Sequence, residues 1–209
     1  MYKEIDINSW KRKSVFEFYK DFDDPFFNIT ANVDVTNLYR FCKENKLSIF
    51  LVNLFVAIEV VNEIPAFKRR LLNGKVVEYE TVNIGSTILH DDETFSFCYF
   101  ERNENIYDFI QKGKENIAKQ NESKQLDPRL NELNAIHCSV IPWLAFTSFK
   151  HAKNFKNNDT IPKLTFGKIF DENEQKRMPL SVAVNHAMMD GVHVGKYFEL
   201  FQGKVNELR

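Results

Sequence analysis

The sequence predicts an α+β fold, a two-layer sandwich in which helices pack on a mostly antiparallel or mixed β-sheet. Strand-like segments outnumber helical ones, an Asn-Gly pair at 73–74 marks a hairpin between two of them, and amphipathic helices lie between the others. Dinucleotide-binding, Walker-type and GxSxG motifs are absent from the chain. Repeats and low-complexity tracts are absent too, and the composition is even, so we expect one domain over residues 1–209.

The first third of the chain gives a strand, two helices and a hairpin. Apolar residues alternate over residues 28–35, as in a strand, and Thr36 is a candidate cap for a short helix. Ser48 is a candidate cap for the apolar helix that follows, which Pro65 closes. Asn73-Gly74 supplies the two positive φ angles of a type I′ turn, so residues 71–77 should form a hairpin.

The remaining elements alternate between the strand period and the helix period. We expect strands at residues 82–89, 94–100, 135–149, 164–170 and 179–185, a helix at 105–119, a surface loop at 121–134 and a turn at 171–177. In the last helix, Val194, Phe198, Phe201, Val205 and Leu208 fall on one stripe, which should face a core.

Charge and composition exclude several classes of protein. The formal net charge is −1 and the pI is about 6.5, so the basic excess of a nucleic-acid-binding protein is missing. The N-terminus carries charges where a signal peptide needs an apolar segment, and polar residues interrupt the apolar run at 49–64, which is too short to span a membrane. Three widely spaced cysteines fit a reducing compartment. We therefore expect a cytoplasmic protein without membrane or nucleic-acid partners.

The segment from Leu180 to His193 concentrates polar groups where a strand ends before the final helix. His186 can exchange a proton near neutral pH, and Asp190 lies four residues further on. From the pattern alone, Asp190 could equally be the N-cap of the last helix, and His186 a buried core histidine. Metal binding by His186, Asp190 and His193 is disfavoured, because Gly191 interrupts the helix that this spacing would need.

His186-Ala-Met-Met-Asp190-Gly191 matches the HxxxDG motif of chloramphenicol acetyltransferases and of the catalytic domains of dihydrolipoyl acyltransferases. Over nearly the whole chain the sequence resembles the chloramphenicol acetyltransferase family. The matching segments, in order, are Trp10-Lys11-Arg12, Phe16-Glu17-Phe18-Tyr19, Pro65-Ala66-Phe67-Lys68, Glu93-Thr94-Phe95-Ser96, Ser139-Val140-Ile141-Pro142-Trp143, Phe146-Thr147-Ser148-Phe149, Leu180-Ser181-Val182 and Asp190-Gly191-Val192-His193-Val194.

This resemblance implies a homotrimer of subunits with the CoA-dependent acyltransferase fold and with active sites at the subunit interfaces. The implied reaction is acetyl transfer from acetyl-CoA, as co-substrate, to a hydroxyl of chloramphenicol, which gives antibiotic resistance; no metal or tightly bound cofactor is implied. His186 would be the general base. Ser139 would donate to the oxyanion of the tetrahedral intermediate, and Thr165 would hold an ordered water near it.

The resemblance also assigns residues outside the reacting centre. Asp190 and Arg12 would form a buried, architectural ion pair, and Lys168 would contact coenzyme A. The acceptor pocket would include the aromatic side chains Tyr19, Phe27, Phe95 and Phe149. Without the resemblance, Arg12 is a solvated residue of a Lys-Arg-Lys run, Ser139 and Thr165 are ordinary strand residues, and the four aromatic residues are core.

Three positions depart from the family pattern. Asn185 replaces the histidine that usually precedes the base, Phe26 adds bulk that we expect to narrow the acceptor pocket, and Ile169 stands where a ring often packs on adenine. Two alternatives stay open: an acyltransferase for another small alcohol or thiol, including lipoyl groups, and a non-catalytic trimeric binding protein of the same fold. No lipoyl domain precedes the motif in this sequence, which disfavours the lipoyl acceptor.

Overall fold

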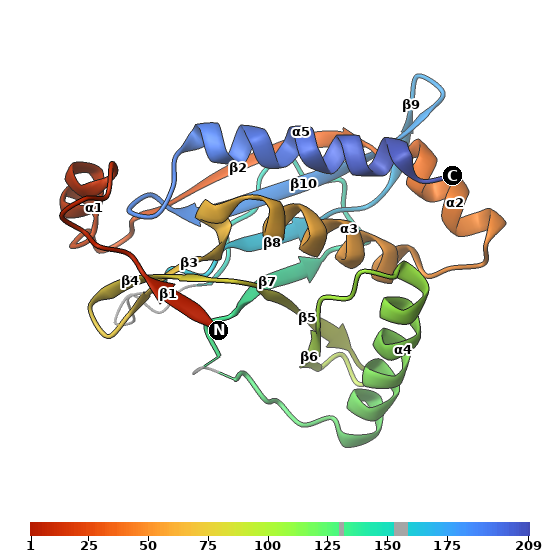
Figure 1. The fold of residues 1–209 in the computed structure, drawn as a ribbon. Helices are drawn as coiled ribbons and strands as arrows, with labels where there is room; N and C mark the ends of the chain where they lie inside the picture. Colours follow the sequence, from red (N-terminus) through yellow and green to blue (C-terminus); the bar gives the residue numbers. More distant parts are fainter. Residues whose placement is uncertain (130–131, 153–158) are drawn as a thin grey trace.

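In the computed structural model, which describes residues 1–129, 132–152 and 159–209, helices cover a large mixed sheet (Figure 1). The helices are α1 (Lys13–Tyr19), α2 (Thr36–Glu44), α3 (Ile49–Glu63), the 3₁₀ turn η1 (Pro65–Lys68), α4 (Ile106–Ser123) and α5 (Gly191–Glu207). The strands are β1 (Tyr2–Glu4), β2 (Phe26–Asp34), β3 (Arg69–Leu72), β4 (Lys75–Tyr79), β5 (Asn83–Leu89), β6 (Phe95–Phe100), β7 (Ala135–Val140), β8 (Lys163–Phe166), β9 (Phe170–Glu172) and β10 (Gln175–Asn185).

The predicted α+β sandwich with a mixed sheet is confirmed. The main sheet has the order β2-β10-β8-β7-β5-β6, with β9 paired to β10, and a small second sheet has the order β1-β4-β3. The β5–β7 and β7–β8 pairs are parallel, and the other pairs are antiparallel. Helices α2, α3, α4 and α5 contribute to one buried cluster with the inner face of the main sheet. Apolar side chains therefore fill one layer of core between helices and sheet.

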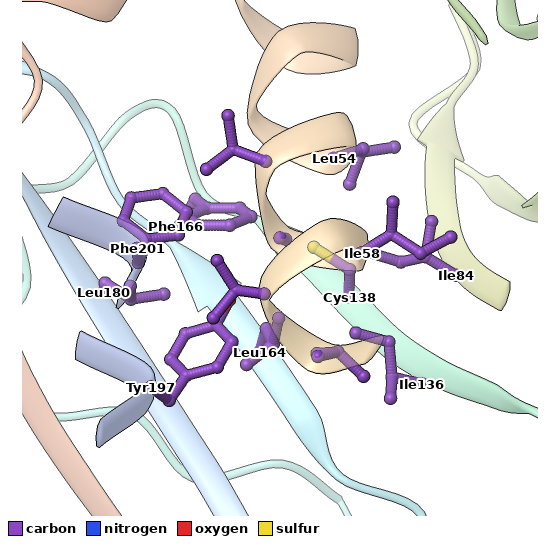
Figure 2. Packing of buried hydrophobic residues seen from close by; sticks show 14 of the residues in the cluster. Leu54, Ile58, Ile84, Ile136, Cys138, Leu164, Phe166, Leu180, Tyr197 and Phe201 are labelled. Atoms are coloured by element: carbon purple, nitrogen blue, oxygen red, sulfur yellow. The ribbon is translucent and has the colours of Figure 1, made fainter. Parts of the chain in front are cut away.

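The core forms because the apolar stripes of α3 and α5 meet alternate residues of the central strands. Figure 2 shows Leu54 and Ile58 of α3 and Tyr197 and Phe201 of α5 against Leu164 and Phe166 of β8. All six are buried. Because side chains alternate along a strand, the residues between these core positions face the opposite side of the sheet. That opposite face includes Ser139 and Thr165.

A smaller cluster joins the N-terminal segment to the end of β10. Phe16 of α1, Val76 of β4 and Met188 after β10 are buried together, and Trp10 and Tyr19 pack against them. The cluster therefore brings residues 10–19 to the turn between β10 and α5, although nearly the whole chain separates them in sequence.

Several element predictions are confirmed, and others are corrected. The Ser48 hydroxyl caps α3 by accepting the Leu51 amide, and Asn73 and Gly74 have φ values of 50° and 79° in the β3–β4 hairpin. The predicted Thr36 cap is wrong: Thr36 is the first residue of α2, Val35 is its N-cap, and the carboxylate of Asp34 accepts the Thr36 amide at 2.9 Å.

Four predicted boundaries are also wrong. The strand predicted at 135–149 ends at Val140, because Pro142 has no amide for a ladder and Lys168 bonds the Leu144 carbonyl instead. The predicted strand 164–170 divides into β8 and β9, and the predicted turn 171–177 is mostly hairpin strand, with only Asn173 and Glu174 at positive φ. The helix predicted at 105–119 extends further, because α4 continues to Ser123 and has Lys124, with a φ of 49°, as its C-cap residue.

Candidate active site

The turn between β10 and α5 presents His186 at the end of a fully buried strand segment. Two hydrogen bonds of the Asn185 side chain hold this turn. Its Oδ1 accepts from the Ala187 backbone amide at 2.9 Å, and its Nδ2 donates to the Asp159 carbonyl at 3.0 Å. The His186 amide donates to the Pro25 carbonyl at 2.8 Å. The backbone that carries His186 is therefore held before any substrate contact is made.

Two aromatic rings hold the His186 imidazole. Tyr19 stacks on it, with ring centroids 4.2 Å apart and planes 8° from parallel, and Phe27 packs at 4.7 Å and 50°. The His186 side chain is 31% exposed, so the alternative of a buried core histidine is wrong. The ring is oriented by packing while part of it remains open to solvent.

The two ring nitrogens of His186 have different surroundings. Nδ1 is buried and lies 3.1 Å from the Asp190 Oδ1 atom, although the geometry is not that of a hydrogen bond. A carboxylate beside Nδ1 favours a proton on that nitrogen, which leaves a lone pair on Nε2. Nε2 is then the nitrogen that can accept a proton from a substrate.

Arg12 and Asp190 form the ion pair that the resemblance implies. The Arg12 guanidinium contacts both Asp190 carboxylate oxygens and donates to the His186 carbonyl at 2.5 Å and the Ala187 carbonyl at 3.2 Å. Hydrogen bonding to Arg12 lowers the pKa of Asp190. The Arg12 side chain is 11% exposed, so the solvated alternative is wrong; Asp190, at 37%, is only half-buried in the single chain.

Asp190 is also the N-cap residue of α5. Its amide donates to His193 Nδ1 at 3.0 Å, so the N-cap interpretation and the ion pair are both correct. Within the three described ranges, no group of three or more His, Cys, Asp or Glu residues could hold a metal ion. One carboxylate therefore joins α1, the end of β10 and the start of α5.

Ser139 and Thr165 lie side by side on neighbouring strands, away from His186. They are partners in the parallel register of β7 and β8. The Thr165 hydroxyl is fully buried and lies 2.9 Å from His151 Nε2. His151 is a site residue that no local sequence pattern indicates, because it lies fourteen residues before Thr165.

Ser139 lies in the lining of a pocket of about 220 Å³. Its lining consists of Gly85, Thr87, Phe97, Tyr99, Pro128, His137, Cys138, Ser139, His151, Ala152 and Lys163. Two of the predicted acceptor-pocket rings lie beside this lining: Phe149 packs on His151 with centroids 4.8 Å apart, and Phe95 packs on Phe97 at 5.6 Å. The other two, Tyr19 and Phe27, hold His186. The four predicted rings thus divide into two pairs.

The sheet register separates His186 from Ser139 and Thr165 within one chain. Thr165 pairs with Ser181 of β10, five residues before His186, and Ser139 lies one strand beyond Thr165. With about 3.3 Å per residue along a strand and about 4.8 Å between strands, Ser139 and His186 are roughly 15–20 Å apart. The predicted site residues therefore form two separate groups in one chain: the His186 half-site is the name used for Arg12, Tyr19, Phe27, His186 and Asp190, and the Ser139 half-site is the name used for Ser139, Thr165 and the pocket.

Lys168 and Ile169 follow β8. Lys168 is exposed, and its amide donates to the Leu144 carbonyl at 2.9 Å, whereas Ile169 packs on the core. This hydrogen bond to Leu144 also holds the segment that contains the exposed Trp143. The ammonium group of Lys168 is thus presented to solvent from a fixed backbone.

Comparison with known proteins identifies the family. The family model described as "Chloramphenicol acetyltransferase" matches residues 1–202. The chain belongs to the chloramphenicol acetyltransferase family. It is 34% identical over 199 residues to a chloramphenicol acetyltransferase of Clostridium perfringens, covering 93% of this chain and 90% of that protein. It is 30% identical over 204 residues to one of Proteus mirabilis, covering 97% and 94%.

Solved structures agree with this assignment. A chloramphenicol acetyltransferase structure superposes with a TM-score of 0.90 at 27% identity, covering 98% of this chain and all of that one. The cubic core of the pyruvate dehydrogenase multienzyme complex superposes with a TM-score of 0.72 at 16% identity over 88% and 83% of the two chains, which shows a shared fold. No helix in the described part of the chain is long and apolar enough to cross a bilayer.

Proposed function

We propose that this protein transfers the acetyl group of acetyl-CoA to a hydroxyl of chloramphenicol, with His186 as general base, and so confers resistance to the antibiotic. The observation that carries the proposal is the imidazole held between Tyr19 and Phe27, with Nδ1 facing Asp190 and the ring partly exposed. Family membership supports chloramphenicol as the acceptor.

In the proposed reaction, the acceptor hydroxyl attacks the thioester carbonyl carbon while His186 Nε2 takes the hydroxyl proton. The new C–O bond forms as the carbonyl π electrons move to oxygen, giving a tetrahedral oxyanion. Its collapse breaks the C–S bond, and the imidazolium returns the proton to the departing CoA sulfur. General base catalysis of this kind contributes about 10²–10⁴-fold in rate.

Ser139 is proposed to stabilise the oxyanion. Ser139 is a half-buried residue of β7 in the lining of the pocket, and a donor aimed at a developing oxyanion acts mainly in the transition state. Thr165 is proposed to stand beside the intermediate, where its buried hydroxyl is oriented by His151. Lys168 is proposed to contact coenzyme A through its exposed ammonium group.

The two half-sites support a homotrimer with active sites at its interfaces. A base and an oxyanion donor must both contact the same reacting carbon centre, which a separation of roughly 15–20 Å does not allow. In a head-to-tail ring, the His186 half-site of one copy faces the Ser139 half-site of the next. Each of the three interfaces of such a ring would then hold one complete site.

An assay that follows thiol release from acetyl-CoA in the presence of chloramphenicol tests the proposal. We expect chloramphenicol-dependent thiol release by the wild-type protein. Thiol release with another alcohol, and none with chloramphenicol, would keep the mechanism but replace the acceptor. If no acceptor supports release, the non-catalytic binding protein becomes the better account.

A further inference from the structure

Asp190 and His193 are joined by two hydrogen bonds in the first turn of α5. The Asp190 backbone amide donates to the Nδ1 atom of the His193 side chain at 3.0 Å, and the His193 backbone amide donates to the Asp190 carbonyl at 3.0 Å. His193 is the third residue of the helix, from which a glutamate or glutamine usually accepts the N-cap amide in a capping box. The imidazole of His193 takes the place of that acceptor, and His193 holds both backbone polar groups of Asp190.

The residue held in this way carries the carboxylate beside the proposed base. Both carboxylate oxygens of Asp190 contact the Arg12 guanidinium, and Oδ1 lies 3.1 Å from His186 Nδ1. Because His193 fixes the Asp190 backbone, the carboxylate can move only by turning about its side-chain bonds, and the ion pair with Arg12 restricts that turning. His193 and Arg12 therefore locate the carboxylate together, one through the backbone and the other through the side chain.

His193 can accept the Asp190 amide because its ring is neutral. An imidazole nitrogen accepts a hydrogen bond only when it carries no proton. Burial, and after it the charge of Arg12, lowers the pKa of the half-buried His193; Arg69 acts in the same direction and Asp190 opposes them. With Nδ1 occupied as an acceptor, the ring proton of His193 lies on Nε2. We therefore expect His186 and His193 to carry their protons on opposite nitrogens.

We propose that His193 is a positioning residue for acetyl transfer, which keeps the Asp190 carboxylate beside Nδ1 of His186. A carboxylate at this place favours the His186 tautomer whose Nε2 can take a proton. If the carboxylate is displaced, part of the His186 population carries its proton on Nε2 and cannot act as the base. The inference rests on the proposed function, because it gives His193 a part in the reaction for which His186 is the proposed base.

Two substitutions of His193 test the role of its acceptor atom. His193→Leu fills a similar space without an acceptor, and His193→Gln supplies one from the capping-box position. Nitrogen NMR of histidine-labelled protein, at about pH 8 where histidine rings are neutral, reports the tautomer of His186 without any substrate. The His186 signals are identified by their loss in His186→Ala. We expect the proton on Nδ1 in the wild-type and His193→Gln proteins, and a substantial fraction protonated on Nε2 in His193→Leu.

Thiol release from acetyl-CoA, with chloramphenicol as acceptor, gives the catalytic readout. His193→Leu should lower kcat about tenfold with the KM of both substrates unchanged, a loss comparable to that of one hydrogen bond. His193→Gln should stay within about threefold of the wild-type kcat. Because His193 acts through the carboxylate, adding His193→Leu to an Asp190→Asn variant should lower kcat little further.

Val194→Ala is the matched control for a loss of stability alone. Val194 is fully buried in the same turn of α5, and its truncation leaves the His193 side chain in place. The variant should lower the free energy of unfolding in urea but keep the wild-type kcat and the wild-type tautomer of His186. If His193→Leu does not fold, His193→Met takes its place, since a thioether is only a weak acceptor.

Any of four results would overturn the inference: an unchanged His186 tautomer in folded His193→Leu protein, a wild-type kcat in that variant, an equal loss of kcat in Val194→Ala at an equal loss of stability, or full additivity of His193→Leu with Asp190→Asn. A wild-type protein that releases no thiol with any acceptor would instead count against the proposed function. The tautomer measurement, which needs no substrate, would still decide the part of His193.

Discussion

At the scale of single residues, the imidazole of His186 is prepared for its proposed role by packing. Replacing His186 with alanine should reduce turnover about 10²–10⁴-fold, because it removes the base but leaves Tyr19 and Phe27 in place. Steady-state thiol release measures the loss, and the thermal unfolding midpoint shows whether the fold is retained. A folded variant with more than about a tenth of the wild-type rate would remove His186 as the base.

Ser139 should affect the rate and not substrate binding. The Ser139→Ala variant should lower kcat by about 10²–10³-fold with little change in KM, because an oxyanion donor acts mainly in the transition state. Ser148 lies exposed in the following loop, and Ser148→Ala is the matched control, for which both constants should stay near wild type. Raised KM with normal kcat in Ser139→Ala would make Ser139 a binding residue.

At the scale of elements, the Arg12–Asp190 pair links the N-terminal segment to the start of α5. Arg12→Ala and Asp190→Ala should each lower the free energy of unfolding by about 1–2 kcal/mol, less than for a fully buried pair because Asp190 is half-exposed. Urea unfolding of both single variants and the double variant measures their coupling. The double variant should lose less than the sum, and strict additivity would show that the two residues do not interact.

Strand β7 should make stability depend on pH through His137. The pKa of His137 is about 4 in the folded chain, against about 6.5 unfolded, because burial and Lys163 disfavour its charge, with Arg70 adding to and Asp159 opposing the effect. The unfolded state therefore binds more protons between these values, and stability falls as pH drops from 6.5 towards 4, by about 2–3 kcal/mol in all.

Between pH 6.5 and pH 4, the unfolding free energy of the His137→Asn variant should fall less than that of the wild-type protein. His193, whose pKa burial also lowers, and Asp190 are present in both proteins, so the comparison isolates His137. Parallel curves for the two proteins from pH 7 to pH 4 would show that His137 does not titrate as described.

Local signals predicted elements where a short stretch decides the structure. Asn73-Gly74 and Ser48 fix a hairpin and a helix start through their own backbone and side chain. Strand β1 and helix α1 were not predicted, because they are short and are held by distant partners: β1 by β4, and α1 by the cluster around Phe16. The strand predicted through 149 ended early because hydrogen bonding beyond Pro142 is irregular.

The same reasoning applies to the candidate site. The HxxxDG segment is contiguous, so His186 and Asp190 could be found from sequence, and the resemblance supplied Arg12. His151 and Lys163 have no local signal, because their environment comes from the β7–β8 register and from Phe26 across the sheet. The alternation of His137, Cys138 and Ser139 could have placed His137 beside Ser139 on one face.

At the scale of the whole molecule, the two half-sites are complementary. The His186 half-site contains the proposed base, packed against two rings, and the Ser139 half-site contains the proposed oxyanion donor beside a pocket. Large apolar side chains are exposed on the single chain in the same regions: Phe18 near the first half-site and Trp143 and Leu144 near the second. Such surface is more typical of an interface than of a monomer. We propose that two copies of the chain build each active site.

Mixing two inactive variants tests this claim most directly. Co-expression of His186→Ala and Ser139→Ala chains with different tags, and purification through both tags, gives mixed assemblies whose thiol release can be compared with each variant alone. A shared site predicts that activity returns to about a third of wild type, because each mixed ring of three chains has one interface that pairs an intact His186 with an intact Ser139. Mixed assemblies no more active than the two single variants would contradict the account.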